Sequence, residues 1–257
     1  MRPLKVIYGP VASWRLGKSL GVDLICSPKK ICSFNCVYCQ LEEEKPTVKK
    51  DRFVSIDKVK EELKNALKKT TPDVITLSGM GEPTLAENMD ETIETIRELT
   101  NLPIAILTNS TLMHNKDMQK SLNKLDIIVA KLDAPNQELL RKINRPAEGI
   151  KFEKTLRGIK ETRRGFRGKF AIQTMFVEEN KDYAEELAAL ARDIQPDEVQ
   201  INTPLRPCKV KPLSQKELDE IEKAFIGLNT LSVYHTTKPM TDPLDKLELI
   251  RRRRDEP

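Results

Sequence analysis

Six short apolar runs, each separated from the next by an amphipathic stretch, constrain the fold of this chain more than any other feature of its sequence. Each run is rich in Val, Ile or Leu, as buried parallel strands are, and between the runs apolar residues recur every three or four positions, as in helices. The runs are GVDLIC (21–26), DVITLS (73–78), IAILT (104–108), DIIVAKL (126–132), FAIQTMFV (170–177) and EVQIN (198–202). Strand-then-helix units in one array predict an α/β protein with a parallel sheet and right-handed crossovers, either an open doubly wound sheet or a partial barrel.

Helix starts can be placed within this array. Ser55, Asn180 and Ser214 each precede an amphipathic stretch, and their side chains can accept a hydrogen bond from the first turn of a helix. We therefore expect these three residues to be N-caps.

The bulk properties favour a cytoplasmic protein with no membrane segment. A chain of 257 residues buries a sizeable core without cysteine staples. Five cysteines is an odd number, and three of them lie in one loop, so a disulfide framework is not expected and a reducing compartment is. No uncharged apolar run approaches the roughly 20 residues that a membrane-spanning helix needs.

Positive charge is concentrated in two places. Between Arg141 and Lys169 there are eleven Lys or Arg residues against three Glu, and Arg251 to Arg254 form a basic tail. Such clusters suit a partner with a phosphate backbone, although a solvated helix face has the same composition.

Unusual residues follow the predicted strands at their carboxyl ends, where βα loops converge and chemistry gathers in parallel α/β folds. A cysteine-rich loop follows the first strand, and a glycine-rich segment follows the second. In chain order these segments are Cys32–Cys39, Gly79–Pro83, Thr108–Thr111, Asp133, Gln173–Thr174 and Asn202–Cys208.

The cysteine loop carries the most specific chemical signal. Cys32, Cys36 and Cys39 have the spacing Cys-x3-Cys-x2-Cys, and soft thiolates select zinc or iron–sulfur clusters. A structural zinc site is closed by four ligands, whereas three thiolates on a four-iron cluster leave one iron open to another ligand. An open metal position indicates a reactive site, with a zinc or electron-transfer site as the alternative.

This motif, with Tyr38 immediately before its last cysteine, resembles the signature of the radical S-adenosylmethionine (radical SAM) enzymes. The resemblance implies a partial (β/α)6 TIM-like barrel over 21–226, with an N-terminal extension over 1–20. A C-terminal extension over 227–257 would hold a short strand at 231–235 and a basic helix at 244–254. It also implies one [4Fe-4S] cluster on the three cysteines, and S-adenosylmethionine (SAM) that is cleaved reductively to a 5'-deoxyadenosyl radical for hydrogen abstraction.

Further residues receive roles from the same resemblance. The segment Gly79-Met80-Gly81-Glu82 matches the family's Gly-Gly-Glu motif, which binds the SAM ammonium group. An ordinary glycine-rich turn has the same kind of sequence and is the alternative. Tyr38 is expected beside the adenine, or is a core aromatic residue. Two sets of polar residues are expected to contact SAM or substrate, or else to cap helices or be satisfied in the core: Asn109, Ser110 and Asp133 at strand ends, and Gln173 and Asn202 at the barrel interior or mouth.

Two cysteines lie outside the triad. Cys208 follows the sixth predicted strand and is a candidate catalytic residue, as a hydrogen donor, substrate anchor or extra ligand, or else a passive thiol. Cys26 ends the first predicted strand and is expected to be a small core residue.

Residues 8–41 resemble a compact branch of the family that is grouped with the wyosine-forming (4-demethylwyosine synthase-like) tRNA enzymes. Trp14 stands where that branch has arginine, and only Cys26 precedes the triad, whereas wyosine-forming enzymes carry further cysteines. Modification of RNA, above all tRNA, is the leading expectation, with a small reductant protein such as ferredoxin or flavodoxin as electron donor. The alternatives are modification of a protein or peptide, including activation of a glycyl-radical enzyme, and a non-catalytic iron–sulfur electron carrier or zinc-binding module.

Overall fold

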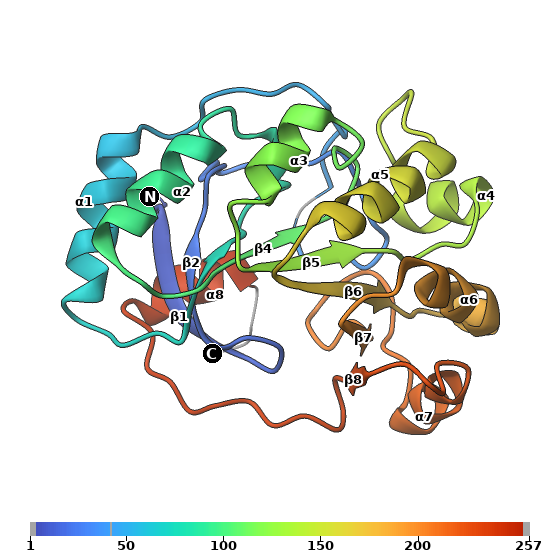
Figure 1. The fold of residues 1–257 in the computed structure, drawn as a ribbon. Coiled ribbons are helices and arrows are strands. Elements are labelled where there is room, and N and C mark those ends of the chain that lie inside the picture. Colours follow the sequence, from blue (N-terminus) through green and yellow to red (C-terminus); the bar gives the residue numbers. More distant parts are fainter. Residues whose placement is uncertain (1–3, 42, 254–257) are drawn as a thin grey trace.

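The structure, a computed structural model, describes residues 4–41 and 43–253, and its centre is one eight-stranded sheet that curls into a half-barrel (Figure 1). The strands lie side by side in chain order; the first two form an antiparallel hairpin, and each later strand is parallel to its neighbour. They are β1 (Ile7–Ser13), β2 (Gly17–Val22), β3 (Val74–Leu77), β4 (Ile104–Thr108), β5 (Ile127–Lys131), β6 (Lys169–Met175), β7 (Glu198–Asn202) and β8 (Thr230–Ser232). The α/β partial barrel predicted for this chain is therefore confirmed.

Most of the helices lie along the outer face of this sheet and connect one parallel strand to the next (Figure 1). The α-helices are α1 (Ile56–Leu67), α2 (Met89–Leu99), α3 (Lys116–Leu122), α4 (Gln137–Leu139), α5 (Phe152–Gly165), α6 (Ala184–Ile194), α7 (Gln215–Lys223) and α8 (Lys246–Arg253). Short helical turns cover η1 (Pro83–Leu85), η2 (Leu140–Asn144, a π-helix) and η3 (Lys181–Tyr183). None of the helices in the described ranges has the length and apolar character that crossing a membrane requires.

The N-terminal part of the chain differs from the expectation. Residues 7–13 and 17–22 are the first two strands of the same sheet, so most of the predicted 1–20 extension is built into it. β2 ends at Val22 rather than at Cys26, because Asp23 Oδ1 accepts hydrogen bonds from the backbone N–H groups of Ile25 and Cys26, at 3.0 and 2.9 Å, and turns the chain. The cysteine loop therefore starts four residues earlier than the apolar pattern predicts.

Two of the three predicted N-caps are confirmed. Ser55 Oγ accepts from Lys58 N, and Ser214 forms a capping box with Glu217. Asn180 makes no such bond to a helix; its Oδ1 accepts from Val177 N, and its Nδ2 donates to the carbonyl of Asp133. The amide of Asn180 thus joins the ends of β5 and β6, which the local sequence does not reveal.

The C-terminal segment follows the predicted order of elements with different bounds. β8 covers Thr230–Ser232 and α8 covers Lys246–Arg253, and α8 packs beside β1 at the opposite edge of the sheet. Arg254, the last residue of the predicted basic helix, lies outside the described residues.

Close packing of helices on the sheet gives a test of the fold. The buried Gly158 of α5 lies on the loop before α3, and a Cβ built on it would be 2.4 Å from His114 N. Ala normally stabilises a helix over Gly by about 1 kcal/mol. Overpacking costs about 1–3 kcal/mol, and a backbone atom at 2.4 Å places this site in the upper part of that range, so the steric cost exceeds the gain from Ala.

We therefore expect Gly158→Ala to lower the free energy of unfolding by about 1–2 kcal/mol, measured by urea denaturation. Gly165→Ala, at the end of the same helix, is the matched control, because the nearest atom to its added Cβ is 4.0 Å away. A Gly158→Ala protein as stable as wild type would show that α5 does not pack as described.

Candidate active site

The carboxyl ends of the parallel strands open into a cavity of about 680 Å³. This volume is in the range of small-molecule and cofactor sites. The cysteine triad lines the cavity together with residues from successive strand ends. Of the residues that the sequence singled out, those on the cavity wall are Cys32, Cys36, Cys39, Tyr38, Gly79, Gly81, Glu82, Asn109, Gln173 and Asn202. Met80, Ser110, Asp133 and Cys208 are not on it.

Backbone hydrogen bonds clamp the cysteine loop between two other loops. On one side Ile31 N donates to the carbonyl of Met80 at 3.1 Å, and Glu82 N donates to that of Ile31 at 3.0 Å. On the other side Val37 N donates to the carbonyl of Ile143, in the π-helix, at 2.9 Å. An irregular loop at a barrel mouth needs such partners for its buried backbone groups. The thiols are therefore placed by residues about 50 and 110 positions away in the chain.

Glycine is required at this clamp. A Cβ on Gly81 would lie 1.7 Å from the carbonyl oxygen of Ile31, and one on Gly79, which has φ +157°, would lie 2.1 Å from Asp23 Cγ. Only glycine lets the 79–82 segment approach the cysteine loop this closely.

Amide groups point at the sulfur atoms of the triad. Cys32 Sγ accepts from Phe34 N at 3.4 Å and from Asn109 Nδ2 at 3.5 Å, and Cys36 Sγ accepts from Asn144 Nδ2 at 3.4 Å. Hydrogen bonds to cysteine sulfur are a means by which proteins tune iron–sulfur clusters. These donors suit thiolates bound to a cluster.

Burial favours the neutral form of two of the thiols, Cys32 and Cys36. It raises the pKa of Cys32, with the nearby charge of Glu82 adding to the effect, and it raises the pKa of Cys36 to about 11. Metal coordination deprotonates a thiol outright, so this environment favours a bound cation over free thiolates. Neither histidine of the chain lines the cavity in the described residues. The donor set is thus three thiols, which fits a cluster with one open iron.

Glu82 of the glycine-rich segment organises neighbouring loops. Its buried carboxylate accepts from Thr84 N, from the hydroxyl groups of Thr84 and Thr108 at 2.7 Å, and from Asn109 N at 2.7 Å. Burial raises the pKa of Glu82, and these bonds oppose the shift. Because protein donors already occupy both oxygens, this side chain holds the ends of β3 and β4 together.

Asp133 has a comparable role behind the cavity. It accepts from the Tyr38 hydroxyl, from Asn144 Nδ2 at 2.7 Å and from Met175 N at 2.8 Å. The sequence suggested a SAM contact here. The structure instead places this carboxylate where it joins the cysteine loop, the π-helix and β6. Tyr38 is held by it, with one face of its ring toward Lys131 Nζ, 5.1 Å from the ring centroid.

The other predicted residues outside the cavity wall have partners of their own. Ser110 is fully buried and donates to the carbonyl of Lys131 at 3.0 Å. The Met80 side chain packs with Ile25 and Leu85. Cys208 Sγ donates to the carbonyl of Val210 at 3.1 Å, away from the triad, so it does not serve as a fourth ligand in this structure.

Two adjacent side chains present donors to the cavity. Lys131 at the end of β5 pairs in register with Gln173 on β6, and its Nζ donates to Gln173 Oε1 at 2.8 Å. Gln173 Nε2 is buried without a hydrogen-bond partner, so a bound acceptor would satisfy it. Sequence reasoning missed Lys131. The available signal was a lysine near the end of the apolar run DIIVAKL, because a charged side chain in a buried strand is costly unless it has a partner.

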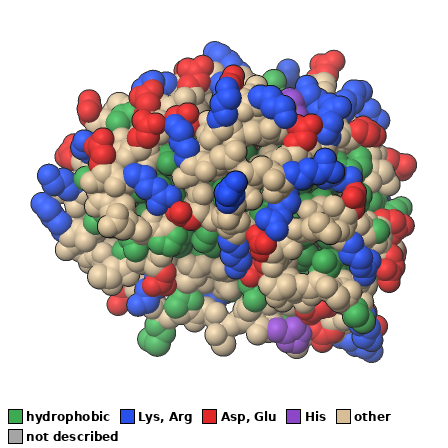
Figure 2. All heavy atoms as spheres, in the orientation of Figure 1, with side chains coloured by type: hydrophobic (Ala, Val, Ile, Leu, Met, Phe, Trp, Pro, Cys, Tyr) green, Lys and Arg blue, Asp and Glu red, His purple; other side chains and the backbone are tan. Residues whose placement is uncertain are grey.

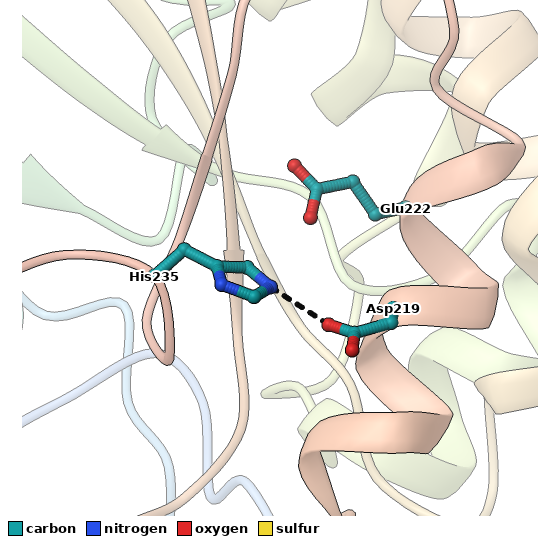
Figure 3. Close-up of side chains that lie close together, drawn as sticks. All are labelled: Asp219, Glu222 and His235. Carbon is teal, nitrogen blue, oxygen red and sulfur yellow. Dashed lines mark hydrogen bonds and ion pairs between the residues drawn. The ribbon is translucent and has the colours of Figure 1, made fainter.

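A second group of potential metal ligands lies outside the cavity. Asp219 and Glu222 project from α7 toward His235, which follows β8, and His235 Nε2 lies 2.8 Å from Asp219 Oδ1 (Figure 3). Glu222 also accepts from the Thr230 hydroxyl at 2.6 Å. These oxygen and nitrogen atoms join α7 to β8 and are not the soft ligands of an iron–sulfur cluster.

The geometry predicts the outcome of cysteine replacement. Cys36→Ala is expected to abolish stable binding of about four irons per chain after anaerobic reconstitution, because two thiolates cannot hold the cluster. Cys208→Ala is the matched control and should bind iron and sulfide as wild type does. The check is iron and sulfide content with the visible absorption spectrum, and equal loss in both variants would contradict the assignment.

Comparisons with known proteins agree with this site. The model of the radical SAM superfamily matches residues 27–191, from the cysteine loop into α6. A UPF0026 protein of Synechocystis sp. is 43% identical over 220 residues, which are 83% of this chain and 79% of that protein. A protein named GTPase Obg from Brachyspira hyodysenteriae is 35% identical over 96% of this chain, but the chain spans only 38% of that protein.

A solved structure shows the same fold. Streptococcus suis SuiB bound to its precursor peptide SuiA has a TM-score of 0.63 and 17% identity, over 84% of this chain and 49% of that one. The family match brings with it the cofactors of the superfamily, a [4Fe-4S] cluster and SAM. The relatives support the superfamily and only part of the expected branch, because the relative from Synechocystis sp. is a UPF0026 protein and the relation to wyosine-forming enzymes stays a prediction. The chain belongs to the radical SAM superfamily and, within it, to the UPF0026 proteins.

Proposed function

We propose that this protein is a radical SAM enzyme that modifies RNA, most directly tRNA. Cys32, Cys36 and Cys39 would hold the cluster, and the 79–82 segment would bind the SAM ammonium group through its backbone. When bound, the cluster and SAM supply a 5'-deoxyadenosyl radical for hydrogen abstraction. A small reductant protein such as ferredoxin or flavodoxin and a cytoplasmic location belong to the same proposal, because the cluster needs an electron and a reducing compartment.

The chain's own residues would bind and orient the reactants. Lys131 Nζ and the unpartnered Gln173 Nε2 offer donors for an anionic or carbonyl group, and Asn202 adds an amide to the wall. The apolar Val129, Met175 and Val233 line the same space and would exclude water. Such positioning is the protein's contribution to a cofactor's chemistry.

The distribution of charge is the observation that carries the RNA proposal. Among the described residues, six Lys or Arg line the cavity, one of them the ion-paired Arg252, whereas both oxygens of its one carboxylate, that of Glu82, accept from protein donors. Outside the cavity, seven exposed cations of the 141–169 segment form no ion pair within the described ranges. This basic face consists of Arg141, Lys142, Lys151, Lys154, Arg157, Arg164 and Arg167. In Figure 2, Lys and Arg side chains gather at the upper right, where Figure 1 places α4 and α5.

The basic face is linked to the cysteine loop. Arg141 and Lys142 belong to the π-helix whose Ile143 carbonyl holds the cysteine loop. A nucleic-acid backbone on these residues would bring a nucleotide to the cavity mouth. The Arg251–Arg254 tail is the other predicted contact for phosphate. Its Arg252 is buried in ion pairs and is not exposed to a phosphate backbone.

Modification of a protein or peptide, including activation of a glycyl-radical enzyme, is the second candidate. It is favoured by the similarity in fold to SuiB, whose structure holds a precursor peptide. Nucleoside and peptide mass spectrometry of cells with and without the gene would separate the two. A third candidate, an electron carrier or zinc module, requires that the reduced protein yields no 5'-deoxyadenosine from SAM.

The basic face generates a binding prediction. Arg141→Ala with Lys142→Ala should weaken binding of an unmodified tRNA transcript several-fold at low salt. It should also lower the slope of log affinity against log salt by about 1 per lost phosphate contact. Fluorescence anisotropy across a salt series measures both quantities.

The matched control removes two exposed cations from another face, Lys64→Ala with Lys68→Ala on and next to α1. It should leave RNA affinity close to that of wild type. RNA binding that both pairs weaken equally, or that does not depend on salt, would count against the proposal.

A further inference from the structure

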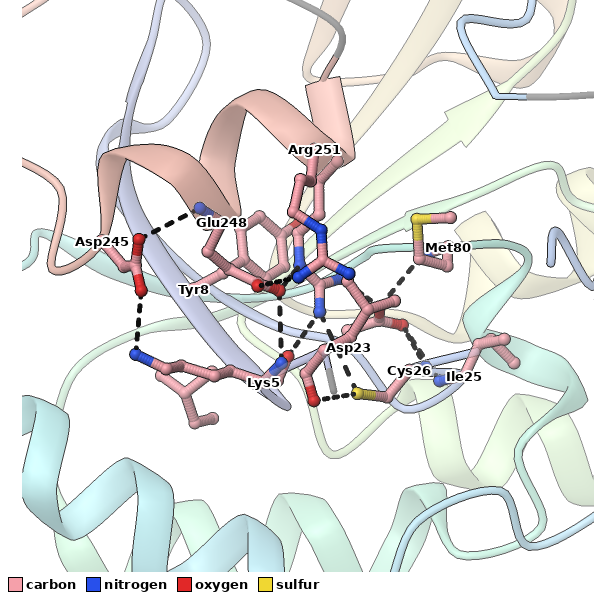
Figure 4. Close-up of polar contacts among 12 residues, drawn as sticks. Lys5, Tyr8, Asp23, Ile25, Cys26, Met80, Asp245, Glu248 and Arg251 are labelled. Atoms are coloured by element: carbon pink, nitrogen blue, oxygen red, sulfur yellow. Dashed lines mark hydrogen bonds and ion pairs between the residues drawn. The ribbon is translucent and has the colours of Figure 1, made fainter. Parts of the chain in front are cut away.

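The helix α8 places the side chain of Arg252 in the interior of the barrel. It lies next to residues 79–82, the segment proposed above to bind SAM. The Arg252 side chain is 3% exposed although it belongs to the basic tail, and it forms ion pairs with Asp23 after β2 and with Glu248 one turn earlier in α8. Figure 4 shows Asp23, Tyr8, Glu248 and Met80 gathered beside α8. A residue near the end of the chain thus meets the turn that starts the cysteine loop.

Protein groups use all three nitrogen atoms of this guanidinium. Nε donates to Glu248 at 2.8 Å, Nη1 donates to Asp23 and Nη2 donates to the carbonyl of Lys5. The guanidinium also lies over the Tyr8 ring, 4.6 Å from its centroid. With the 4.0 Å contact from Nη2 to Cys26 Sγ, these bonds use four of the five N–H groups of Arg252, so its effect on the site passes mainly through these neighbours.

Two of those neighbours hold the segment from Ser78 to Glu82. Asp23 Oδ2, which accepts from Arg252, also accepts from Met80 N at 3.2 Å. The Tyr8 hydroxyl forms a hydrogen bond of 2.8 Å with Ser78 Oγ. Asp23 and Tyr8 are both tightly packed against the backbone. A Cβ on Gly79 would lie 2.1 Å from Asp23 Cγ, and one on Gly21 would lie 2.2 Å from Tyr8 Cζ.

We propose that Arg252 is a positioning residue for SAM: through Asp23 and Tyr8 it fixes the backbone of residues 78–82 in the form that binds the cofactor. The proposal rests on the assignment of that segment to SAM made above. A buried ion pair adds little net stability, because desolvating two charges offsets their attraction. Its specific geometry, with the planar fork of Arg on a carboxylate and an aromatic ring, suits a role in orientation.

The test removes the pair without leaving Asp23 as a lone charge, and Glu248 keeps Lys5 N at 3.2 Å and Arg251 at 3.6 Å as partners. Arg252→Met alone leaves Asp23 buried without its partner, which can prevent folding. The double variant Asp23→Asn/Arg252→Met keeps an oxygen for Ile25 N and Cys26 N, since these bind Oδ1, and loses the acceptor for Met80 N. Arg251→Met is the control, because it removes a neighbouring cation and its 3.6 Å ion pair to Glu248 but leaves the Arg252–Asp23 pair in place.

Two measurements on reconstituted, reduced holoenzyme compare the variants. Equilibrium dialysis with labelled SAM gives its dissociation constant, and the steady-state release of 5'-deoxyadenosine gives KM and kcat. The double variant is expected to bind SAM about tenfold more weakly and to have a higher KM, with kcat within about twofold and wild-type iron content. Arg251→Met should match wild type in every quantity.

Wild-type affinity for SAM in the folded double variant would overturn the proposal, as would a loss of kcat and iron in proportion to a loss of folded protein. No RNA is present in these measurements, so a failure of the RNA proposal would leave them unchanged. If wild type itself bound no SAM, both the assignment of residues 78–82 and the role of Arg252 would fall.

Discussion

The site depends on the hydrogen bonds that hold an irregular cysteine loop at the mouth of the half-barrel. The loop lacks regular structure where it carries the thiols, so its buried N–H and C=O groups need partners elsewhere. The glycine-rich segment after β3 and the π-helix after β5 supply them on opposite sides. This clamp fixes the backbone that carries the three thiols.

Behind the clamp, buried carboxylates also join separate loops by accepting hydrogen bonds from them. Glu82 joins the ends of β3 and β4, Asp133 joins the cysteine loop to β6, and Asp23 joins β2, the 79–82 segment and α8. Each accepts several donors from separate loops, so moving one loop leaves a buried charge partly unsatisfied. The acidic residues of this rim therefore act as structural centres, and the charge facing the cavity is positive.

The site also combines firmly held and unsatisfied groups. The Nδ2 atoms of Asn109 and Asn144 donate to cysteine sulfurs, whereas Gln173 Nε2, beside Lys131, has no hydrogen-bond partner. Unpaired buried donors are costly, and they are retained where a ligand completes them. The wall near β5 and β6 is thus prepared for a molecule that brings acceptors.

The amino-acid sequence by itself determined the features that depend on near neighbours. Apolar runs and helical periodicity predicted the parallel array, Ser55 and Ser214 marked helix starts, and the spacing of three cysteines indicated an open cluster. The tertiary structure alone decided which polar residues face the cavity. Asp133 and Ser110 turn away from it, Lys131 turns toward it, and Arg252 leaves the basic tail for the interior. The physical reason is that a polar side chain's role is set by the partners that satisfy it when buried, and here those partners lie up to 247 positions away in the chain.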